Sequence, residues 1–267
     1  AQRQQSIAAF IVGLVAGGLA LGRQWARLKA LIRRASAEFA QLAEPDDKVN
    51  LRTVYVSGDL VTKGSEFANS GLFRLLAEQG VRILVESVCD ELEFLAYQHP
   101  RFAFGRLATP LEVVAYRKGM ISLRKHLYRI ARESSPWLPS PDVRASLDRT
   151  SDLLDPKTVG SSALAVGSVL HHWESYPVDG VVMTHCWGCD DGRIEESLLR
   201  RVRAMPTYFH YDDGTPVDER RVRGFVYRLQ REPARTAPVA ASVHRNKTSW
   251  WRARSRRART ASLGDPS

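Results

Sequence analysis

The chain has 267 residues, of which 44% are hydrophobic, so it is long enough and apolar enough to build a folded core. Its three cysteines are too few for a disulfide framework, which excludes the small disulfide-rich secreted domains and favours a reducing, cytoplasmic location. The formal net charge is +10, which indicates an anionic partner only if the folded part carries that charge.

The chain opens on a helical segment, expected over residues 1–50. An apolar run of fifteen residues, Ile7 to Leu21, is shorter than the roughly 20 residues that a bilayer helix needs, and several glycines interrupt it. The helical pattern continues to Leu42, and Pro45 ends it. We therefore expect a buried or interdomain helix, and no transmembrane helix.

Residues 51–232 alternate between strand-like and helix-like patterns. Strands are predicted at 52–60, 81–87, 179–185 and 206–213, and helices at 64–80, 112–133, 161–177, 192–205 and 218–231. Strand, helix and strand at this spacing form right-handed parallel βαβ units. The predicted fold is α/β, a mainly parallel open sheet flanked by helices of the Rossmann or flavodoxin-like kind, preceded by the helical segment. Residues 90–160 are less clearly patterned, and 134–142 is a Pro-rich loop.

Most of the positive charge lies at the C-terminal end. Residues 233–267 hold eight Lys or Arg against one acid, a difference of +7, which leaves only about +3 for the rest. Without apolar periodicity, this segment is expected to be a basic disordered tail. Its arginines around Trp250 and Trp251 suit nucleic acid or an anionic membrane, which defines an alternative function, a non-catalytic interaction module. A solvated extension without a partner is the simpler interpretation.

Cysteines follow two of the predicted strands. Cys89 follows the second strand, and Cys186 and Cys189 follow the third. Because the carboxyl ends of parallel strands share one edge of a sheet, these cysteines are expected to converge there, where ligands bind in such folds.

Four interpretations of the cysteines stay open. Cys186-x-x-Cys189 resembles a thioredoxin redox site, but a single helix fills the gap from Cys189 to Pro206, which is the wrong topology. A structural zinc site takes four ligands, and the spacing of His171, His172 and His185 does not match that of zinc ligands. An iron–sulfur cluster held by thiolates from separate loops is the third interpretation, and free buried cysteines are the simplest one.

Four aspartates follow the third and fourth strands: Asp190, Asp191, Asp212 and Asp213. We expect them to cap helices or lie in solvated loops, with proton transfer to a substrate as the alternative role.

Three stretches, at 55–95, 178–214 and 219–229, together resemble subunits of the 2-hydroxyacyl-CoA dehydratase and benzoyl-CoA reductase family, including proteins related to its activators. They are "YVSGDLVTKGSEFANSGLFRLLAEQGVRILVESVCDELEFL", "VDGVVMTHCWGCDDGRIEESLLRRVRAMPTYFHYDDG" and "ERRVRGFVYRL". The resemblance places Cys89 and Cys189 at cluster-binding positions, with Cys186 as an extra thiol. Arg221 and Phe225 match the arginine and the aromatic residue of the last helix.

The resemblance implies a [4Fe-4S] cluster held by three cysteines, for which Cys89, Cys189 and Cys186 are the candidates here. It also implies a second dehydratase-type subunit and an ATP-dependent activator that delivers single electrons. The electron reduces the thioester carbonyl of an acyl-CoA to a ketyl radical, and a hydroxyl group then leaves. Nucleic acid is not an expected partner of such an enzyme.

The sequence departs from the family in two ways. The family's first cysteine lies in a preceding α/β domain, so we expect this chain to be an N-terminally truncated fragment. Glu91 and Glu93 replace a glycine-rich continuation after Cys89.

Overall fold

The computed structural model describes residues 2–42, 51–98, 110–158 and 160–235. The chain divides into two compact units, which are described separately. Unit 1 combines Ala1–Lys48 with Lys118–Ser140, and unit 2 combines Val49–Arg117 with Pro141–Ser267.

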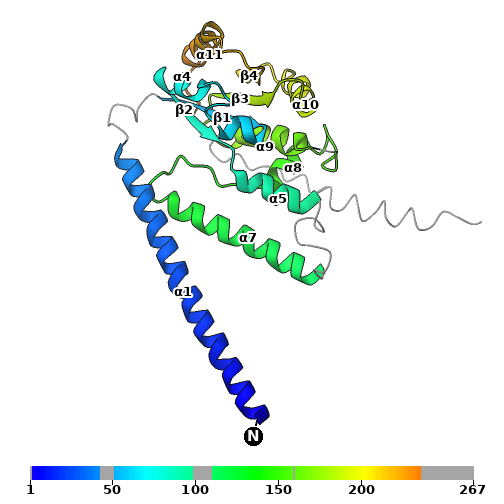
Figure 1. Ribbon diagram of the computed structural model, residues 1–267. Coiled ribbons are helices and arrows are strands. Elements are labelled where there is room, and N and C mark those ends of the chain that lie inside the picture. The colour runs from blue at the N-terminus through cyan, green and yellow to red at the C-terminus, as the bar shows by residue number, and fades with distance from the viewer. Residues whose placement is uncertain (1, 43–50, 99–109, 159, 236–267) are drawn as a thin grey trace, which may run out of the picture. The chain divides into compact units, whose positions relative to one another are not determined.

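Unit 2 contains a sheet of four parallel strands in the order β2-β1-β3-β4 (Figure 1). The strands are β1 (Arg52–Gly58), β2 (Val81–Val85), β3 (Gly180–Cys186) and β4 (Thr207–Asp212). Each lies where the sequence predicts a strand, so the α/β fold with a parallel sheet and an N-terminal helix is confirmed. Parallel strands need long crossovers, and the helices of unit 2 supply them.

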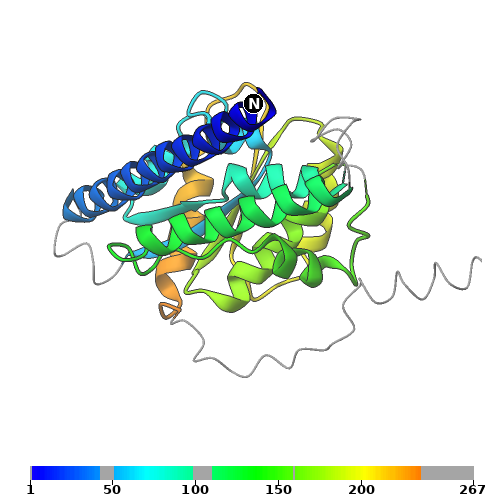
Figure 2. The same ribbon diagram turned by 90° about the horizontal axis from the view of Figure 1, so that it is seen from below.

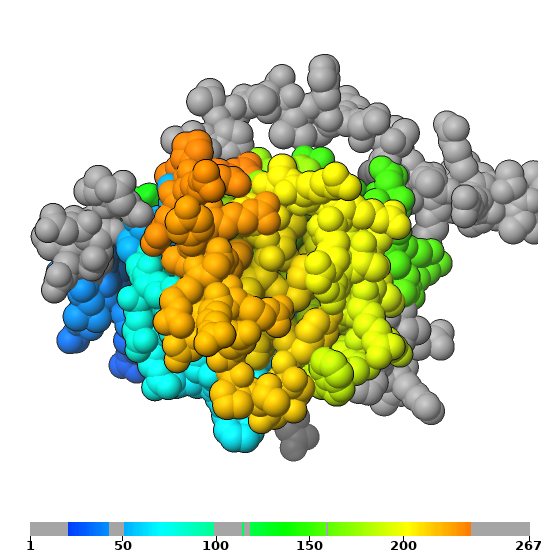
Figure 3. Space-filling view, turned by 90° about the horizontal axis from the view of Figure 1, so that it is seen from above, coloured from blue at the N-terminus to red at the C-terminus, as the bar shows by residue number. Residues whose placement is uncertain are grey.

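One face of the sheet is covered by α4 (Leu72–Glu78) and α11 (Glu219–Arg231), which Figure 3 shows in cyan and orange. Side chains alternate along a strand, so Val54 and Val56 of β1 point to this face. They form a core with Leu72 and Leu76 of α4 and with the apolar side of α11, Val222, Phe225, Val226 and Leu229. The α11 sequence places these apolar residues at three- and four-residue steps, which gives one buried stripe.

The opposite face carries α9 (Ser162–Ser175), which packs on β1, and α8 (Val143–Thr150), which packs on α9. Tyr55 of β1 points to this side, where its hydroxyl lies 2.6 Å from Ser168 Oγ and its ring stacks on His172 at 4.0 Å. The remaining helices of unit 2 are α3 (Leu60–Gly64), α5 (Val88–Gln98) and α10 (Asp190–Leu199).

The sequence did not predict α5 or α8, which lie in the weakly patterned region. Each is short, and its apolar residues become buried only against other helices: Phe94 of α5 packs with Val143 and Leu147 of α8 and with Leu164 of α9. Tertiary packing therefore stabilises two helices that local periodicity leaves undecided.

Unit 1 is built from α1 (Gln2–Leu42) and from the part of α7 (Pro110–Ala131) and the following loop that lie within 118–140. Trp25 contacts His126 with 5.6 Å between ring centroids, and Arg33 pairs with Glu133. These contacts occur in the same order along both segments, so the two helices run in the same direction, as Figure 2 shows for the blue and green helices. Within the described ranges, no helix is both long enough and apolar enough to cross a membrane.

The predicted basic tail is described only at its start. The backbone N–H of Arg235 donates to Asp179 Oδ1 at 2.9 Å, and its guanidinium lies 3.5 Å from the Trp173 ring centroid. Residues 236–267, including Trp250 and Trp251, lie outside the described residues, so the interaction-module function stays a prediction.

Close packing of α8 on α9 gives a stability prediction. A Cβ at Gly167 would overlap the Ser146 carbonyl oxygen and Thr150 Oγ1 of α8, so Gly167→Ala should destabilise the protein by about 1–3 kcal/mol. Gly224 in α11 has open space around it, so Gly224→Ala should instead stabilise by about 0.5–1 kcal/mol through helix propensity. Urea unfolding of both variants measures the two signs, and equal effects would contradict the tight α8–α9 contact.

Candidate functional site at the carboxyl edge of the sheet

Parallel pairing brings the last residues of all four strands to one edge of the sheet. β1 ends at Gly58, β2 at Val85, β3 at Cys186 and β4 at Asp212. Polar side chains gather directly behind these ends, and several of them are fully buried. In open α/β sheets this edge is where ligands bind, so we treat it as the candidate site.

The structure brings Cys186 and Cys189 together. Cys186 is the last residue of β3, Cys189 precedes α10 as its N-cap residue, and the Cys189 N–H donates to the Cys186 carbonyl oxygen at 3.3 Å. Gly188 closes this turn with a φ of 76°, a conformation that favours glycine. The sequence pair thus forms one compact dithiol turn, with Cys186 exposed and Cys189 half-buried.

The thiol of Cys186 is not an activated nucleophile. Desolvation, followed by the neighbouring Cys189 thiol, raises the pKa of Cys186 above its usual value. A redox thiol of the thioredoxin kind needs a lowered pKa, so the environment of Cys186 opposes that interpretation. A metal ion would have to displace the proton on binding.

Cys89 lies apart from this pair along the edge. It is exposed near the start of α5, and its N–H donates to Ser87 Oγ at 3.2 Å. β2, which precedes it, lies on the other side of β1 from β3, so two strand spacings of about 4.8 Å separate the two chain ends. In the described part of the chain, no hydrogen bond joins Cys89 to the pair, and no three His, Cys, Asp or Glu side chains are grouped to hold a metal ion. The three-cysteine ligand set therefore stays a prediction. Of its three members, Cys186 and Cys189 lie together in one turn.

The aspartates that follow the strands make local structural contacts. Asp191 accepts hydrogen bonds from Ser162 Oγ at 2.7 Å and from the Ser161 N–H at 3.2 Å, which ties α10 to the start of α9. Asp213 accepts from the N–H and hydroxyl of Thr215, and Asp212 accepts from the Gly214 N–H at 3.4 Å. Asp190 lies in the first turn of α10, where a carboxylate is favourable.

A buried ionic network lies behind the ends of β1 and β2. Lys63 Nζ donates to Glu86 Oε2 at 2.7 Å, to the Gly58 carbonyl oxygen at 3.1 Å and to Glu91 Oε1 at 3.0 Å, and Ser57 Oγ also donates to Glu86. The Lys63 and Glu86 side chains are 1% and 0% exposed. Burial alone would lower the pKa of Lys63, but attraction from Glu86 and Glu91 outweighs it and raises the pKa. Lys63 is therefore a fixed ammonium, and Glu91, one of the two unexplained acids after Cys89, is a member of this network.

A second buried pair, His185 and Glu195, lies beside the dithiol turn. His185 Nε2 is 3.3 Å from Glu195 Oε2, and both side chains are 1% exposed. Desolvation lowers the pKa of His185 to about 4 and raises the pKa of Glu195 well above its ordinary value of 4.5. Both shifts favour the uncharged forms, a neutral imidazole beside a protonated carboxylic acid, and so oppose an ion pair.

Two glycines make room for the His185 ring. A Cβ at Gly192 of α10 would lie 2.8 Å from His185 Cγ, and one at Gly58 would lie 3.0 Å from His185 Cε1. Gly58 also has a φ of 111°, so it combines an unusual backbone conformation with close approach to β3. The turn that carries Cys186 thus lies next to a tightly packed and buried pair.

An aromatic group borders the dithiol turn on the β4 side. Trp187, between the two cysteines, is 72% exposed, and its ring packs edge to face on Tyr211 at 6.3 Å. The Tyr211 hydroxyl donates to Glu196 Oε2 at 2.5 Å, and Arg200 also pairs with Glu196. These contacts hold Tyr211 in place while the Trp187 side chain stays open to solvent.

Sequence analysis missed both buried pairs. Lys63 and Glu86 lie in the stretch 55–95, where no local pattern marks them as a buried pair, and Glu195 is one of several charged residues of an amphipathic helix. His185 was considered only as a zinc ligand. Nothing local marks these residues, because their burial depends on how α3, α5 and α10 pack against the sheet.

No protein-family model matches the chain, and neither the curated proteins nor the solved structures include a match. The fold and the site define an α/β protein with a dithiol turn at the carboxyl edge of a parallel sheet, beside buried ionisable groups.

The buried ion pair gives a stability prediction. Lys63→Met leaves the Glu86 carboxylate buried without its counter-ion and should destabilise the protein by about 3–5 kcal/mol. Lys63→Met combined with Glu86→Leu removes both charges and should recover part of that loss. Arg34→Met breaks an exposed pair with Glu38, whose side chains are 79% and 59% exposed, and should cost less than about 1 kcal/mol. Denaturant unfolding measures all three variants.

Glu195 gives a prediction about pH. Its folded-state pKa lies above the unfolded value, so as pH rises past about 4.5 the unfolded chain loses a proton that the folded protein keeps, and the folded state loses stability. The side chain that replaces Glu195 in Glu195→Gln cannot titrate. The unfolding free energy of this variant relative to the wild type should therefore increase as the pH rises above about 4.5. Desolvation alone would raise the pKa of Glu196, but its bonds to Tyr211 and Arg200 outweigh it and lower the pKa. The unfolding free energy of Glu196→Gln relative to the wild type should therefore fall as the pH rises toward about 4.5 and stay level above it. The same trend in both variants would contradict a buried neutral Glu195.

Proposed function

We propose that this chain is part of an iron–sulfur protein of the 2-hydroxyacyl-CoA dehydratase type, or of the related activase branch. In this proposal, Cys186 and Cys189 contribute to the ligand set of a [4Fe-4S] cluster, and Cys89 is the third candidate ligand. When bound, such a cluster supplies single electrons for reduction of an acyl-CoA thioester. The second subunit and the ATP-dependent activator follow from the resemblance alone.

The observation that carries the proposal is the dithiol turn, which brings Cys186 and Cys189 together at the end of β3. Thiolates are the ligands that iron–sulfur clusters prefer, and the exposed side of the turn leaves room for further ligands. The turn also lies at the sheet edge where α/β proteins bind ligands.

The cysteines fit only part of a cluster's ligand set. A cluster of this type takes about four ligands, whereas the described residues offer one thiol pair in a single turn and a separate Cys89. The proposal therefore requires ligands from elsewhere, such as a second subunit or residues outside the described ranges.

Two buried side chains, His185 and Glu195, lie next to the dithiol turn. With a pKa lowered to about 4, His185 adds no positive charge beside Cys186 at neutral pH, and the burial of Glu195 opposes a negative charge beside Cys189. Close packing of such side chains beside a metal centre is one of the means by which proteins tune it.

The test is anaerobic reconstitution of the full chain with ferrous iron, sulfide and a small thiol that can fill the missing ligand positions. We expect the wild type to bind iron and sulfide in equal amounts and to give an EPR signal on reduction. Cys186→Ser combined with Cys189→Ser should lower bound iron by about tenfold or more, because both ligands of the turn are lost.

Cys89→Ser is the matched comparison, since it removes one exposed thiol outside the dithiol turn. It should lower bound iron only if Cys89 is the third ligand. Unfolding midpoints of all variants establish that they are folded. A wild type without bound iron and sulfide, or a double variant that retains both, overturns the proposal.

A further inference from the structure

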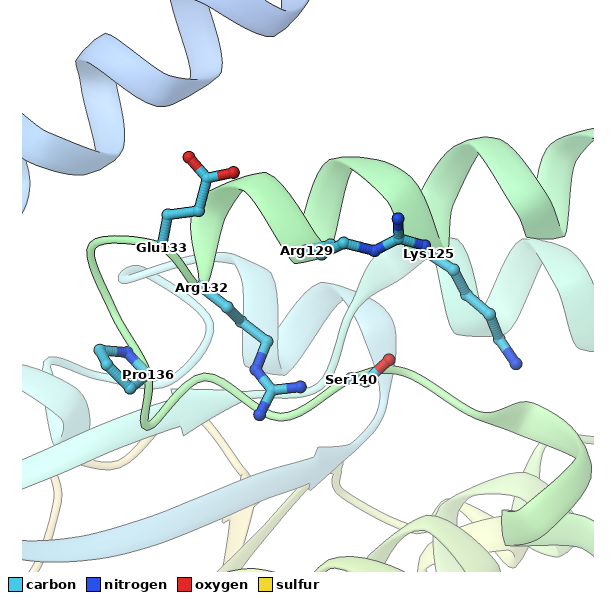
Figure 4. Close-up of a pocket in the computed structure, with 6 residues that line it drawn as sticks. All are labelled: Lys125, Arg129, Arg132, Glu133, Pro136 and Ser140. Carbon is cyan, nitrogen blue, oxygen red and sulfur yellow. The ribbon is translucent and has the colours of Figure 1, made fainter.

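Unit 1 contains a hollow of about 500 Å³ beside the last turns of α7, far in sequence from the dithiol turn. Figure 4 shows its lining: Lys125 and Arg129 on the helix, Arg132 and Glu133 just after it, and Pro136 and Ser140 on the loop that folds back. All of these residues lie within the 118–140 segment of unit 1. A volume of this size falls in the range of about 300–1,000 Å³ typical of small-ligand sites.

Helical spacing places the positive charges on one side. Lys125 and Arg129 are four residues apart, and Arg132 follows three residues later, so all three project from neighbouring positions. At about 1.5 Å per residue, they span only about 10 Å along the axis. In Figure 4 the Arg132 guanidinium points toward Ser140 across the hollow.

The one carboxylate of the lining does not neutralise these cations. Glu133 turns away toward α1, where Arg33 Nε lies 2.8 Å from Oε2 and a second guanidinium nitrogen lies 3.3 Å from Oε1. This hydrogen bonding lowers the pKa of Glu133, so the group stays an anion paired with Arg33. Glu133 is therefore paired with Arg33 and not with Arg129 or Arg132 of the lining.

Arg129 and Arg132 also lack acidic partners of their own. Within the described ranges, neither side chain forms an ion pair or a side-chain hydrogen bond. Other arginines at helical spacing from an acid form such pairs, as Arg34 does with Glu38 and Arg200 with Glu196. Two unpaired guanidinium groups facing one hollow form a site for an external anion.

We infer that this hollow binds the phosphate groups of a small phosphorylated molecule, with Arg129 and Arg132 as the main contacts. The planar guanidinium group matches two phosphate oxygens at once, which a point charge such as Lys does not. Two arginines and Lys125 suit a di- or triphosphate better than a single carboxylate. Ser140 borders the same space with a hydroxyl group.

The dimensions favour a small ligand over a nucleic acid. Nucleic acid binding uses a groove that follows the backbone over several nucleotides, with aromatic side chains for stacking. This lining has no aromatic side chain, and its cations lie within two turns of one helix. The inference is independent of the proposed cluster, since it concerns different residues in the other unit.

Calorimetric titration of the full chain with inorganic pyrophosphate and tripolyphosphate tests the inference. We expect saturable binding of the wild type to one site, and a loss of about tenfold or more in affinity for Arg129→Gln combined with Arg132→Gln. Arg33→Gln should weaken binding by a smaller factor with both lining arginines intact, because it leaves the charge of Glu133 unpaired beside the hollow.

The matched control is Arg23→Gln combined with Arg27→Gln, which removes two exposed charges from the same unit that do not line the hollow. Affinity should change by less than about twofold. Equal losses in both double variants, or no saturable binding by the wild type, overturn the inference. So does a single-stranded oligonucleotide that binds more tightly than tripolyphosphate and is released by the Arg129 and Arg132 changes, which would assign the hollow to nucleic acid.

Discussion

Parallel hydrogen bonding between the four strands is the constraint on which the candidate site of unit 2 depends. It places the ends of β1, β2, β3 and β4 along one edge, so residues from segments more than 100 positions apart in sequence meet there. Helices cover the apolar faces of the sheet on both sides. Polar residues behind the strand ends are buried together with these faces. The chemistry of the site follows from how those polar groups accommodate burial.

Unit 2 buries ionisable groups in two different ways. Lys63 remains an ammonium, because Glu86 and Glu91 accept hydrogen bonds from it at 2.7 and 3.0 Å, and Ser57 adds a hydrogen bond to Glu86. His185 and Glu195 instead favour their uncharged forms, since desolvation moves both pKa values in the direction of the neutral form. The charged pair lies behind β1 and β2, and the neutral pair lies beside the dithiol turn, so the two sides of the same edge have different electrostatics.

The two units offer chemically distinct surfaces. The carboxyl edge of the sheet presents two soft thiols from a turn that lies beside the buried His185 and Glu195, which suits a metal centre. Unit 1 presents hard, permanently charged guanidinium groups around a hollow, where Arg33 keeps the only carboxylate of the lining occupied. Neither surface needs the other for its chemistry, so each can be tested by substitutions that leave the other intact.

The sequence by itself determined the four strands, the long helices and the parallel α/β class, because β-branched runs and apolar periodicity are local properties of the chain. It also placed Cys89, Cys186 and Cys189 after strand ends. Only the tertiary structure decided the strand order, which puts β2 and β3 on opposite sides of β1 and so leaves Cys89 farther along the edge from Cys186 and Cys189. It also decided the partners of Lys63 and His185, because desolvation acts on an ionisable group only once packing has removed it from water.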